Sequence, residues 1–157
     1  MTTEELAHTL ATYGAGLQAE LALLQQLEAL AIRQHAASTD NDLNRLTLVG
    51  DERARLMSAL VQLEHDLKPL REIIAARLSA ARQIPGFDEV LVRHRHASEL
   101  VTQIMESDRL VLRQLQDAET ARREAKHAIE TGENTLAAYR RVIAPSVASV
   151  GLIDRRG

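Results

Sequence analysis

The sequence contains no cysteine and no tryptophan, and its aromatic residues are limited to Phe87, Tyr13 and Tyr139. Without cysteine the chain can form neither a disulfide nor a thiolate metal site. The near absence of aromatic residues disfavours a sheet, because aromatic and β-branched side chains are those that fill pleated surfaces. The remaining apolar residues are dominated by leucine and alanine, which are strong helix formers. Composition therefore predicts an all-α protein.

An excess of basic charge and a long apolar run are also lacking. The formal net charge is −3, so no positive field is available to hold phosphates, and nucleic acid is not an expected partner. No window approaches the roughly 18 uncharged apolar residues that a membrane-spanning helix needs. The N-terminal residues lack the basic start and apolar run of a signal peptide. We expect one helical domain over residues 1–157, located in the cytoplasm and not inserted in a membrane.

Apolar residues recur at steps of three and four, the spacing of an amphipathic helix face. A first helix is predicted to open at Thr2 or Thr3, whose hydroxyl can cap free backbone N–H groups. The polar segment over residues 38–42 predicts a turn. A second helix is then expected over residues 39–83, kinked at Pro69 because proline removes one backbone hydrogen bond. The two predicted stripes are Leu6, Leu10, Tyr13, Leu17, Leu21, Leu24, Leu27 and Ala31, and then Leu46, Val49, Arg53, Leu56, Leu60, Leu63, Leu67, Leu70, Ile74 and Leu78.

Pro85-Gly86 predicts a turn, after which a heptad pattern runs to Ile143. Such a strict 3.5-residue period is typical of coiled-coil packing. The third helix, residues 87–144, is expected to end at Pro145 and to leave a flexible tail over residues 145–157. The predicted fold is an antiparallel bundle of three long helices with coiled-coil-like packing, and its C-terminal helix extends beyond the bundle. The predicted seam is Val90, His94, Ala97, Val101, Ile104, Asp108, Val111, Leu115, Ala118, Arg122, Ala125, Ile129, Gly132, Leu136, Tyr139 and Ile143.

The predicted second and third helices differ in length, at about 65 Å and about 85 Å for a rise of about 1.5 Å per residue. In an antiparallel hairpin around Pro85-Gly86, Thr39 would lie opposite residue 131. The apolar residues that follow would then have no partner within the hairpin. Apolar surface without an internal partner is folded back or used for binding. We therefore predict a partner-binding surface formed by Ile129, Leu136, Tyr139, Val142 and Ile143.

Three charged residues, Arg53, Asp108 and Arg122, occupy seam positions, where a buried charge needs a partner. We expect Asp108 to pair with an arginine across the bundle and to specify the register. His94 and His96 are the best metal-like pair, but residues two apart point to different sides of a helix, so no metal site is expected. No Gly-rich phosphate loop, nucleophile elbow or H-E-x-x-H motif occurs in the sequence. No enzymatic activity and no cofactor are predicted.

Three segments and the final IDRRG carry a family resemblance: Leu23–Leu30 (LLQQLEAL), Leu43–Leu60 (LNRLTLVGDERARLMSAL) and Glu133–Arg141 (ENTLAAYRR). The chain resembles the bacterial flagellar export chaperones of the FlgN type, with some FliT-like features in the second helix. The likeness covers nearly the whole chain in layout. It implies a cytoplasmic chaperone that binds the C-terminal segments of hook-filament junction proteins and delivers them to the type III export apparatus.

In that family a C-terminal amphipathic helix holds the client, and no catalytic residues are implied. The residues also leave an alternative open, a structural coiled-coil or oligomerisation protein whose seam pairs with a second copy and has no client.

Overall fold

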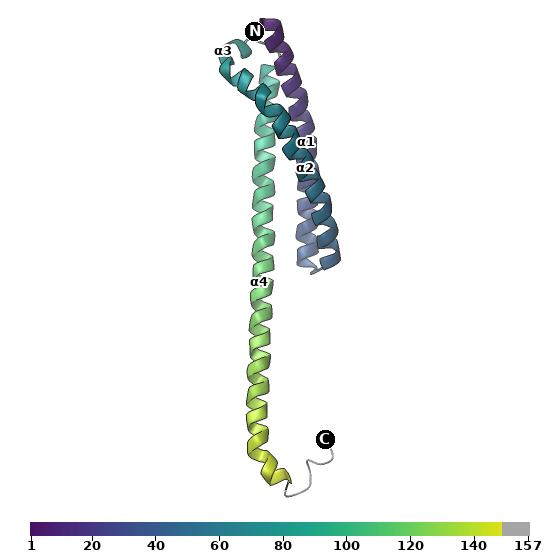
Figure 1. The fold of residues 1–157 in the computed structure, drawn as a ribbon, viewed down its shortest axis with the longest axis vertical. Helices are drawn as coiled ribbons and strands as arrows, with labels where there is room; N and C mark the ends of the chain where they lie inside the picture. Colours follow the sequence, from purple (N-terminus) through teal and green to yellow (C-terminus); the bar gives the residue numbers. More distant parts are fainter. Residues whose placement is uncertain (149–157) are drawn as a thin grey trace. The chain divides into compact units, whose positions relative to one another are not determined.

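A computed structural model describes the backbone of residues 1–148 and the side chains of residues 1–141. Its helices are α1 (Thr3–Thr39), α2 (Leu43–Ala76), α3 (Leu78–Ala81) and α4 (Phe87–Ala148) (Figure 1). No strand occurs within residues 1–148, so the prediction of an all-helical protein is confirmed. Within the same residues, no helix is apolar enough over a sufficient length to cross a membrane.

Contacts between residues divide the chain into two compact units. The first unit, residues 1–114, contains α1, α2, α3 and the start of α4. The second unit, residues 115–157, contains the rest of α4. Most of the predicted tail over residues 145–157 lies outside the described residues.

Helix α1 begins with a capping box at the predicted position. The Thr2 hydroxyl accepts a hydrogen bond from the backbone N–H of Glu5 at 3.1 Å, and the Glu5 carboxylate accepts one from the backbone N–H of Thr2 at 2.6 Å. These bonds satisfy N–H groups for which a helix itself offers no acceptor. The bond from the Thr2 backbone holds the pKa of Glu5 below its ordinary value.

The turn between α1 and α2 lies where the polar segment predicts it, and it is shorter than that segment. Residues 38–39 still belong to α1, so the turn consists of residues 40–42. Asn41 has a φ of 53°, a left-handed conformation that asparagine tolerates better than most residues. The Asp42 side chain caps α2 by accepting a hydrogen bond from the backbone N–H of Arg45 at 3.1 Å. Polar residues and their hydrogen bonds thus form the turn.

Helix α2 ends at Ala76, which corrects the expectation of one helix over residues 39–83. Arg77 interrupts the helix, because its φ of −123° and ψ of 34° lie outside the helical range. Beyond this break, Ala81 and Ile84 are buried in the core. The chain then turns at the predicted glycine, Gly86, whose φ of 93° costs a glycine little.

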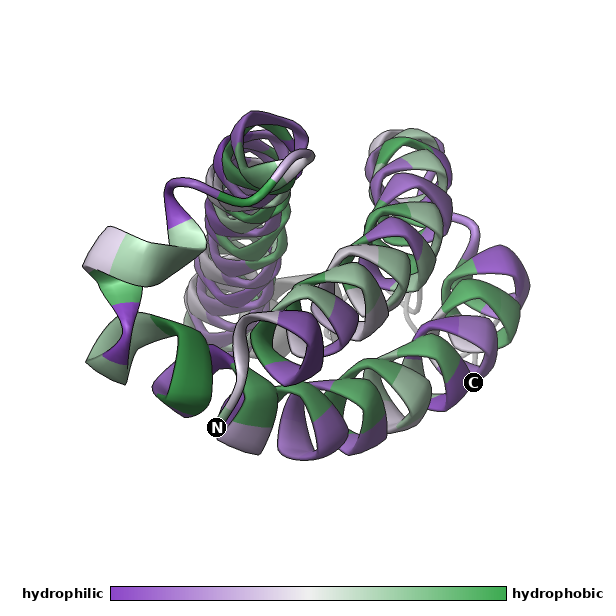
Figure 2. Ribbon diagram, turned by 90° about the horizontal axis from the view of Figure 1, so that it is seen from above, coloured by the Kyte–Doolittle hydropathy of each residue, from purple (hydrophilic) through white to green (hydrophobic). Residues whose placement is uncertain are grey.

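Pro69 does not divide α2, which continues through it as the sequence analysis expects. The kink at Pro69 stays a prediction. The predicted α2 stripe is buried or half-buried from Leu46 to Ile74, whereas Leu78, beyond the break, is exposed. The α1 stripe is buried or half-buried over its whole predicted length. In Figure 2, hydrophobic and hydrophilic segments alternate along the ribbons, as expected of amphipathic helices.

Two clusters of apolar side chains form the core of the first unit. The first joins the N-terminal half of α1 to the end of α2, to α3 and to the start of α4, and the second joins the C-terminal half of α1 to α4. Sequence order in these contacts shows that the chain reverses direction between α1 and α2. The first cluster consists of Leu6, Leu10, Tyr13, Leu17, Leu67, Ile74, Ala81, Ile84, Phe87 and Val90, and the second of Leu24, Leu27, Ala97, Leu100 and Ile104.

The buried face of α4 in the first unit differs from the predicted seam at His94 and Val101. Ala97 and Ile104 are buried as predicted, but Val101 is 39% exposed while its neighbour Leu100 is only 5% exposed. Predicted seam residue His94 is exposed as well. Leu56 and Leu60 of α2 also pack against the second cluster, so this face of α4 meets two helices, and Leu100 is buried in place of Val101.

The register of the first unit also differs from the expected one. Placing Thr39 opposite residue 131 would place Arg53 opposite a residue near 117, but Arg53 contacts Asp108, about nine residues earlier. The difference arises because α2 ends at Ala76, so residues 77–86 do not lengthen it. At its other end α4 continues to Ala148, and therefore passes Pro145 instead of ending there. Its backbone remains helical for the last turn although proline offers no N–H.

Candidate protein-binding surface

The second unit presents its side chains to solvent. Every residue from Leu115 to Arg141 is exposed. Large apolar residues among them are Leu115, Ile129, Leu136 and Tyr139, which are 42, 63, 68 and 62% exposed. Single exposed apolar side chains are common on protein surfaces. A row of them on one helix, however, indicates a surface that another molecule can cover.

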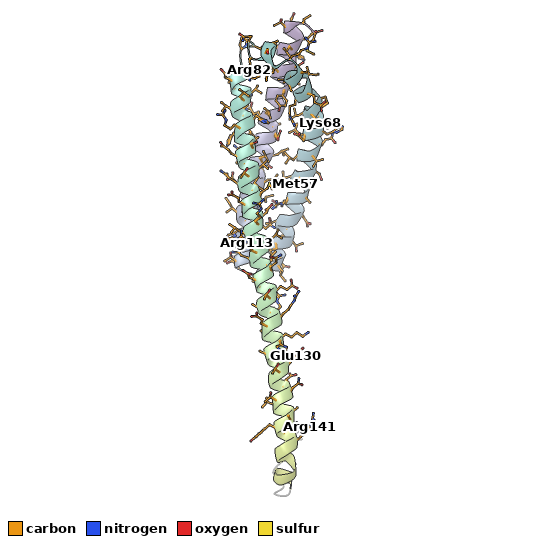
Figure 3. All side chains as sticks on the ribbon, turned by 90° about the vertical axis from the view of Figure 1, so that its left-hand side faces the viewer. Met57, Lys68, Arg82, Arg113, Glu130 and Arg141 are labelled. Carbon is orange, nitrogen blue, oxygen red and sulfur yellow. The ribbon has the colours of Figure 1, made fainter. Side chains whose placement is uncertain are left out.

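Three of the five predicted binding residues belong to this row. Ile129 and Leu136 are seven residues apart and Tyr139 follows three residues later, a spacing that places all three on one face of α4. Side chains on this part of the helix, where Glu130 and Arg141 are labelled in Figure 3, stand away from the ribbon. The side chains of Val142 and Ile143, the other two predicted residues, lie outside the described residues.

A shallow hollow lies beside Leu136. Its lining is Glu133, Leu136, Ala137, Arg140 and Arg141, so it shares only Leu136 with the row. Two of the lining residues are apolar and three are charged. Both kinds of side chain are therefore available to an amphipathic partner.

The same part of α4 contains exposed ion pairs. Arg123 Nη2 lies 2.5 Å from a Glu119 carboxylate oxygen, and Lys126 Nζ lies 3.9 Å from one of Glu130. Pairs of this kind, four residues apart, stabilise a helix by about 0.3–0.5 kcal/mol each. They support the helix and leave the apolar face uncovered.

A charged contact occupies the seam of the first unit. Both Nη atoms of Arg53 donate hydrogen bonds to the Asp108 carboxylate, one of them at 2.6 Å to Oδ1, and Nη1 also donates to Gln34 Oε1 at 2.9 Å. The hydrogen bond to Asp108 raises the pKa of Arg53. The prediction that Asp108 pairs with an arginine across the helices is thereby confirmed. Arg122, the other charged seam residue, is exposed in the second unit.

Sequence reasoning missed a polar cluster in the first unit. Arg71 Nε donates a hydrogen bond to the Tyr13 hydroxyl at 3.2 Å, and its Nη2 donates to Glu64 at 2.5 Å. The bond to Glu64 raises the pKa of Arg71. Burial raises the pKa of Glu20 nearby, and the Glu64 carboxylate raises it further. Tyr13 was recognised only as an apolar stripe residue, and the sequence gives no signal that its hydroxyl meets a charged group.

His94 and His96, the best metal-like pair of the sequence, are both exposed. His94 lines the same cleft as the polar cluster. Among the residues whose side chains are described, no three potential metal ligands lie close enough together to hold an ion.

A second apolar hollow in the first unit was also missed. Ile32 of α1 and Leu110 of α4 line it together with polar residues, and both are exposed. They lie off the predicted seams, and heptad reasoning treats such positions as solvated. The remaining lining residues are His35, Gln103, Glu106 and Ser107.

Comparison of the chain with protein-family models, with curated proteins and with solved structures finds no match. Function is therefore inferred from the residues of these surfaces.

Proposed function

We propose that this protein is a chaperone that holds amphipathic helical segments of other proteins along the exposed row of α4. The observation that carries the proposal is the exposure of Ile129, Leu136 and Tyr139 on one helix face. Covering such a side chain with apolar atoms contributes about 1.5–3 kcal/mol. Three of them would contribute about 4.5–9 kcal/mol, which is comparable with the cost of association.

The client class follows from the resemblance to flagellar export chaperones of the FlgN type. In this proposal the client is the C-terminal segment of a hook-filament junction protein, and the protein releases it to the type III export apparatus in the cytoplasm. Support comes from the segment Glu133–Arg141, which carries part of the resemblance and also contains the exposed Leu136 and Tyr139. The net charge of −3 favours protein over nucleic acid as the partner.

The proposal assigns different roles to the two parts of the chain. An antiparallel bundle of three long helices serves as the folded base, and the C-terminal helix extends beyond it to receive the client. Support for the base comes from the two apolar clusters of the first unit. Support for the receiving role comes from the exposure of every residue from Leu115 to Arg141.

The direct test is calorimetric titration of the full-length protein with peptides from the C-terminal segments of junction proteins. Replacing Leu136 and Tyr139 with alanine should weaken binding by about 2 kcal/mol per residue, which is tens-fold in affinity each. A matched control replaces Val61 and Val92 with alanine, because both are similarly exposed but belong to the first unit. Equal affinity of the two double variants would place the binding face elsewhere.

A truncation tests the same point more severely. A chain ending at Ala128 keeps α1, α2, α3 and the start of α4, and should therefore retain most of its helical circular dichroism signal. It should lose client binding. A truncated chain that binds the peptides with full affinity would contradict the proposal.

The heptad pattern of the second unit favours a second candidate, a structural coiled-coil protein without a client. Affinity capture from cells followed by mass spectrometry separates the two functions. Recovery of flagellar junction proteins supports the chaperone. Recovery of this chain alone supports the coiled-coil protein.

A further inference from the structure

Charges of opposite sign alternate along the second unit of α4, and this pattern is complementary to itself. We propose that, in the absence of a client, α4 pairs with α4 of a second copy of this chain, antiparallel and centred between Glu130 and Thr131. The pairing goes beyond the proposed function and does not rest on it, since it concerns the protein alone.

Two rows of residues lie beside the exposed seam of the second unit. In a coiled coil two rows of residues flank the apolar seam and decide which helices pair and in which direction. One row in the second unit is Glu119, Lys126, Glu133 and Arg140, seven residues apart and strictly alternating in charge. The described residues of the other row, Ala121, Ala128 and Thr135, are uncharged. All seven are exposed on one continuous helix.

Antiparallel pairing at the proposed centre brings opposite charges together. Glu119 meets Arg140 of the second copy, and Lys126 meets Glu133 of the second copy. Because the arrangement is two-fold symmetric, each contact occurs twice. All four contacts are attractive, and none brings like charges together.

Neighbouring registers lose this complementarity. A shift of one heptad in one direction places Glu119 beside Glu133 of the second copy and Lys126 beside Lys126. A shift in the other direction places Lys126 beside Arg140 and Glu133 beside Glu133. Like charges at flanking positions destabilise a coiled coil. The charge order therefore specifies one register.

Side-chain sizes agree with the same register. Ile129 faces Gly132 of the second copy and Ala125 faces Leu136, so a large side chain meets a small one in both layers. Nothing lies within 4 Å of a Cβ built on Gly132, which leaves room for the isoleucine. Close packing requires this kind of match between large and small residues.

The layer formed by Arg122 and Tyr139 also favours antiparallel over parallel pairing. Arg122 faces Tyr139 of the second copy, and a guanidinium over an aromatic ring is attractive. A parallel, in-register pair would instead place Arg122 against Arg122 and Gly132 against Gly132, with a like-charge contact in one layer and a gap in the other. Direction is therefore determined by the seam as well as by the flanking charges.

Existing ion pairs within the helix do not prevent this contact. Glu119 binds Arg123 and Lys126 binds Glu130 of the same helix, but all four side chains are more than half exposed, and such pairs contribute little. The seam also contains Ala118, Ala125 and Gly132, so the contact is shallow. A weak, concentration-dependent dimer is expected, which a client helix can displace.

Sedimentation of the full-length protein over a hundredfold concentration range tests the pairing through charge reversal. Either K126E or E133K alone places like charges together and should weaken the dimer at least tenfold. The double variant K126E/E133K, and an equimolar mixture of the two single variants, restore opposite charges and should recover the parent's association. Reversal at Glu124, which lies outside the flanking rows, is the matched control and should change the constant less than twofold.

Cysteine crosslinking tests direction, because the chain has no cysteine of its own. Ala128 should face Thr135 of the second copy, so a mixture of A128C and T135C should form a disulfide-linked dimer readily, and A128C alone should not. In a parallel, in-register pair each seam residue faces its own equivalent, so A125C alone would crosslink with itself. That result, a monomer at every concentration, or failure of the mixed charge variants to associate would overturn the proposal. Circular dichroism of each variant confirms that α4 remains helical.

Discussion

Removing the Asp108 carboxylate measures how much its contact with Arg53 stabilises the first unit. The side chains of Arg53 and Asp108 are only 20 and 31% exposed, so Asp108→Ala leaves a guanidinium that is mostly shielded from water with Gln34 as its remaining acceptor. Breaking a fully buried pair costs about 3–5 kcal/mol and breaking an exposed pair costs at most about 1 kcal/mol. We expect an intermediate loss of about 2 kcal/mol in the free energy of unfolding.

Replacing both partners should have a different effect. In Arg53→Met with Asp108→Leu, no charge is left unpaired and apolar atoms fill the seam. Desolvation of an ion pair often offsets its attraction, so such a replacement is frequently neutral or stabilising. We expect the double variant to regain most of the stability that Asp108→Ala loses. The double variant lacks the Arg53–Asp108 ion pair, which was expected to specify the register of the helices.

Urea unfolding followed by circular dichroism measures these differences, with the slope of the transition checked for two-state behaviour. Glu119→Ala is the matched control, because it removes the carboxylate from an ion pair whose side chains are both more than half exposed. It should change the free energy of unfolding by less than about 0.5 kcal/mol.

A double-mutant cycle over Arg53 and Asp108 should give a coupling energy of at least about 1 kcal/mol. If Asp108→Ala costs no more than Glu119→Ala, or if the coupling is zero, the reasoning about shielding of this pair is refuted.

Three further changes test other contacts by urea unfolding unless stated. Burial raises the pKa of Glu20, so the folded protein favours the neutral carboxyl group. The stability associated with this neutral group is complete below about pH 4 and is lost as the pH rises through the raised pKa. Glu20→Gln should therefore be more stable than the parent at pH 7 and equal to it below about pH 4. Thr2→Ala removes the capping box and should cost about 1 kcal/mol, with faster amide exchange in the first turn of α1. Gly50→Ala meets open space and should stabilise α2 by about 0.5–1 kcal/mol, whereas Gly16→Ala would overlap the buried Leu67 side chain and should destabilise the fold by about 1–3 kcal/mol. A stabilising Gly16→Ala or a destabilising Gly50→Ala would contradict the packing described here.

Local features of this fold were predictable because they depend on few residues. The cap at Thr2 needs only a hydroxyl and a glutamate three residues later. The turn over residues 40–42 needs only a polar run with an asparagine that accepts a positive φ. Apolar periodicity likewise placed the α1 stripe, since leucine spacing alone defines that face.

Features that depend on packing between distant residues were not predictable. Leu100 and Val101 are both apolar, and only the positions of α1 and α2 decide which of them is buried. The end of α2 at Ala76 has no local signal, because the residues that follow, Arg77 and Leu78, are both good helix formers. The register error followed from this missed break.

The candidate surface was predicted in part. Exposure of Ile129, Leu136 and Tyr139 agrees with the expectation of an uncovered row, while their binding role stays a prediction. The hollow at Ile32 and Leu110 could not be foreseen, because these residues lie on different helices and only the fold brings them together.

The continuity of α4 has a consequence for how its second unit gains and loses order. An isolated helix must first form a nucleus at a statistical weight of about 10⁻³, and only then does it lengthen cheaply. Since α4 starts at Phe87 within the packed first unit, that nucleus already exists when the chain reaches Leu115. Beyond this point, where all described side chains are exposed, each further residue adds or removes one hydrogen bond at small cost. On heating, the second unit should therefore lose its helical structure gradually, beginning at the end farthest from the first unit. A bound partner helix would stabilise only the part of α4 that it contacts. The length of the partner therefore determines how much of α4 remains helical.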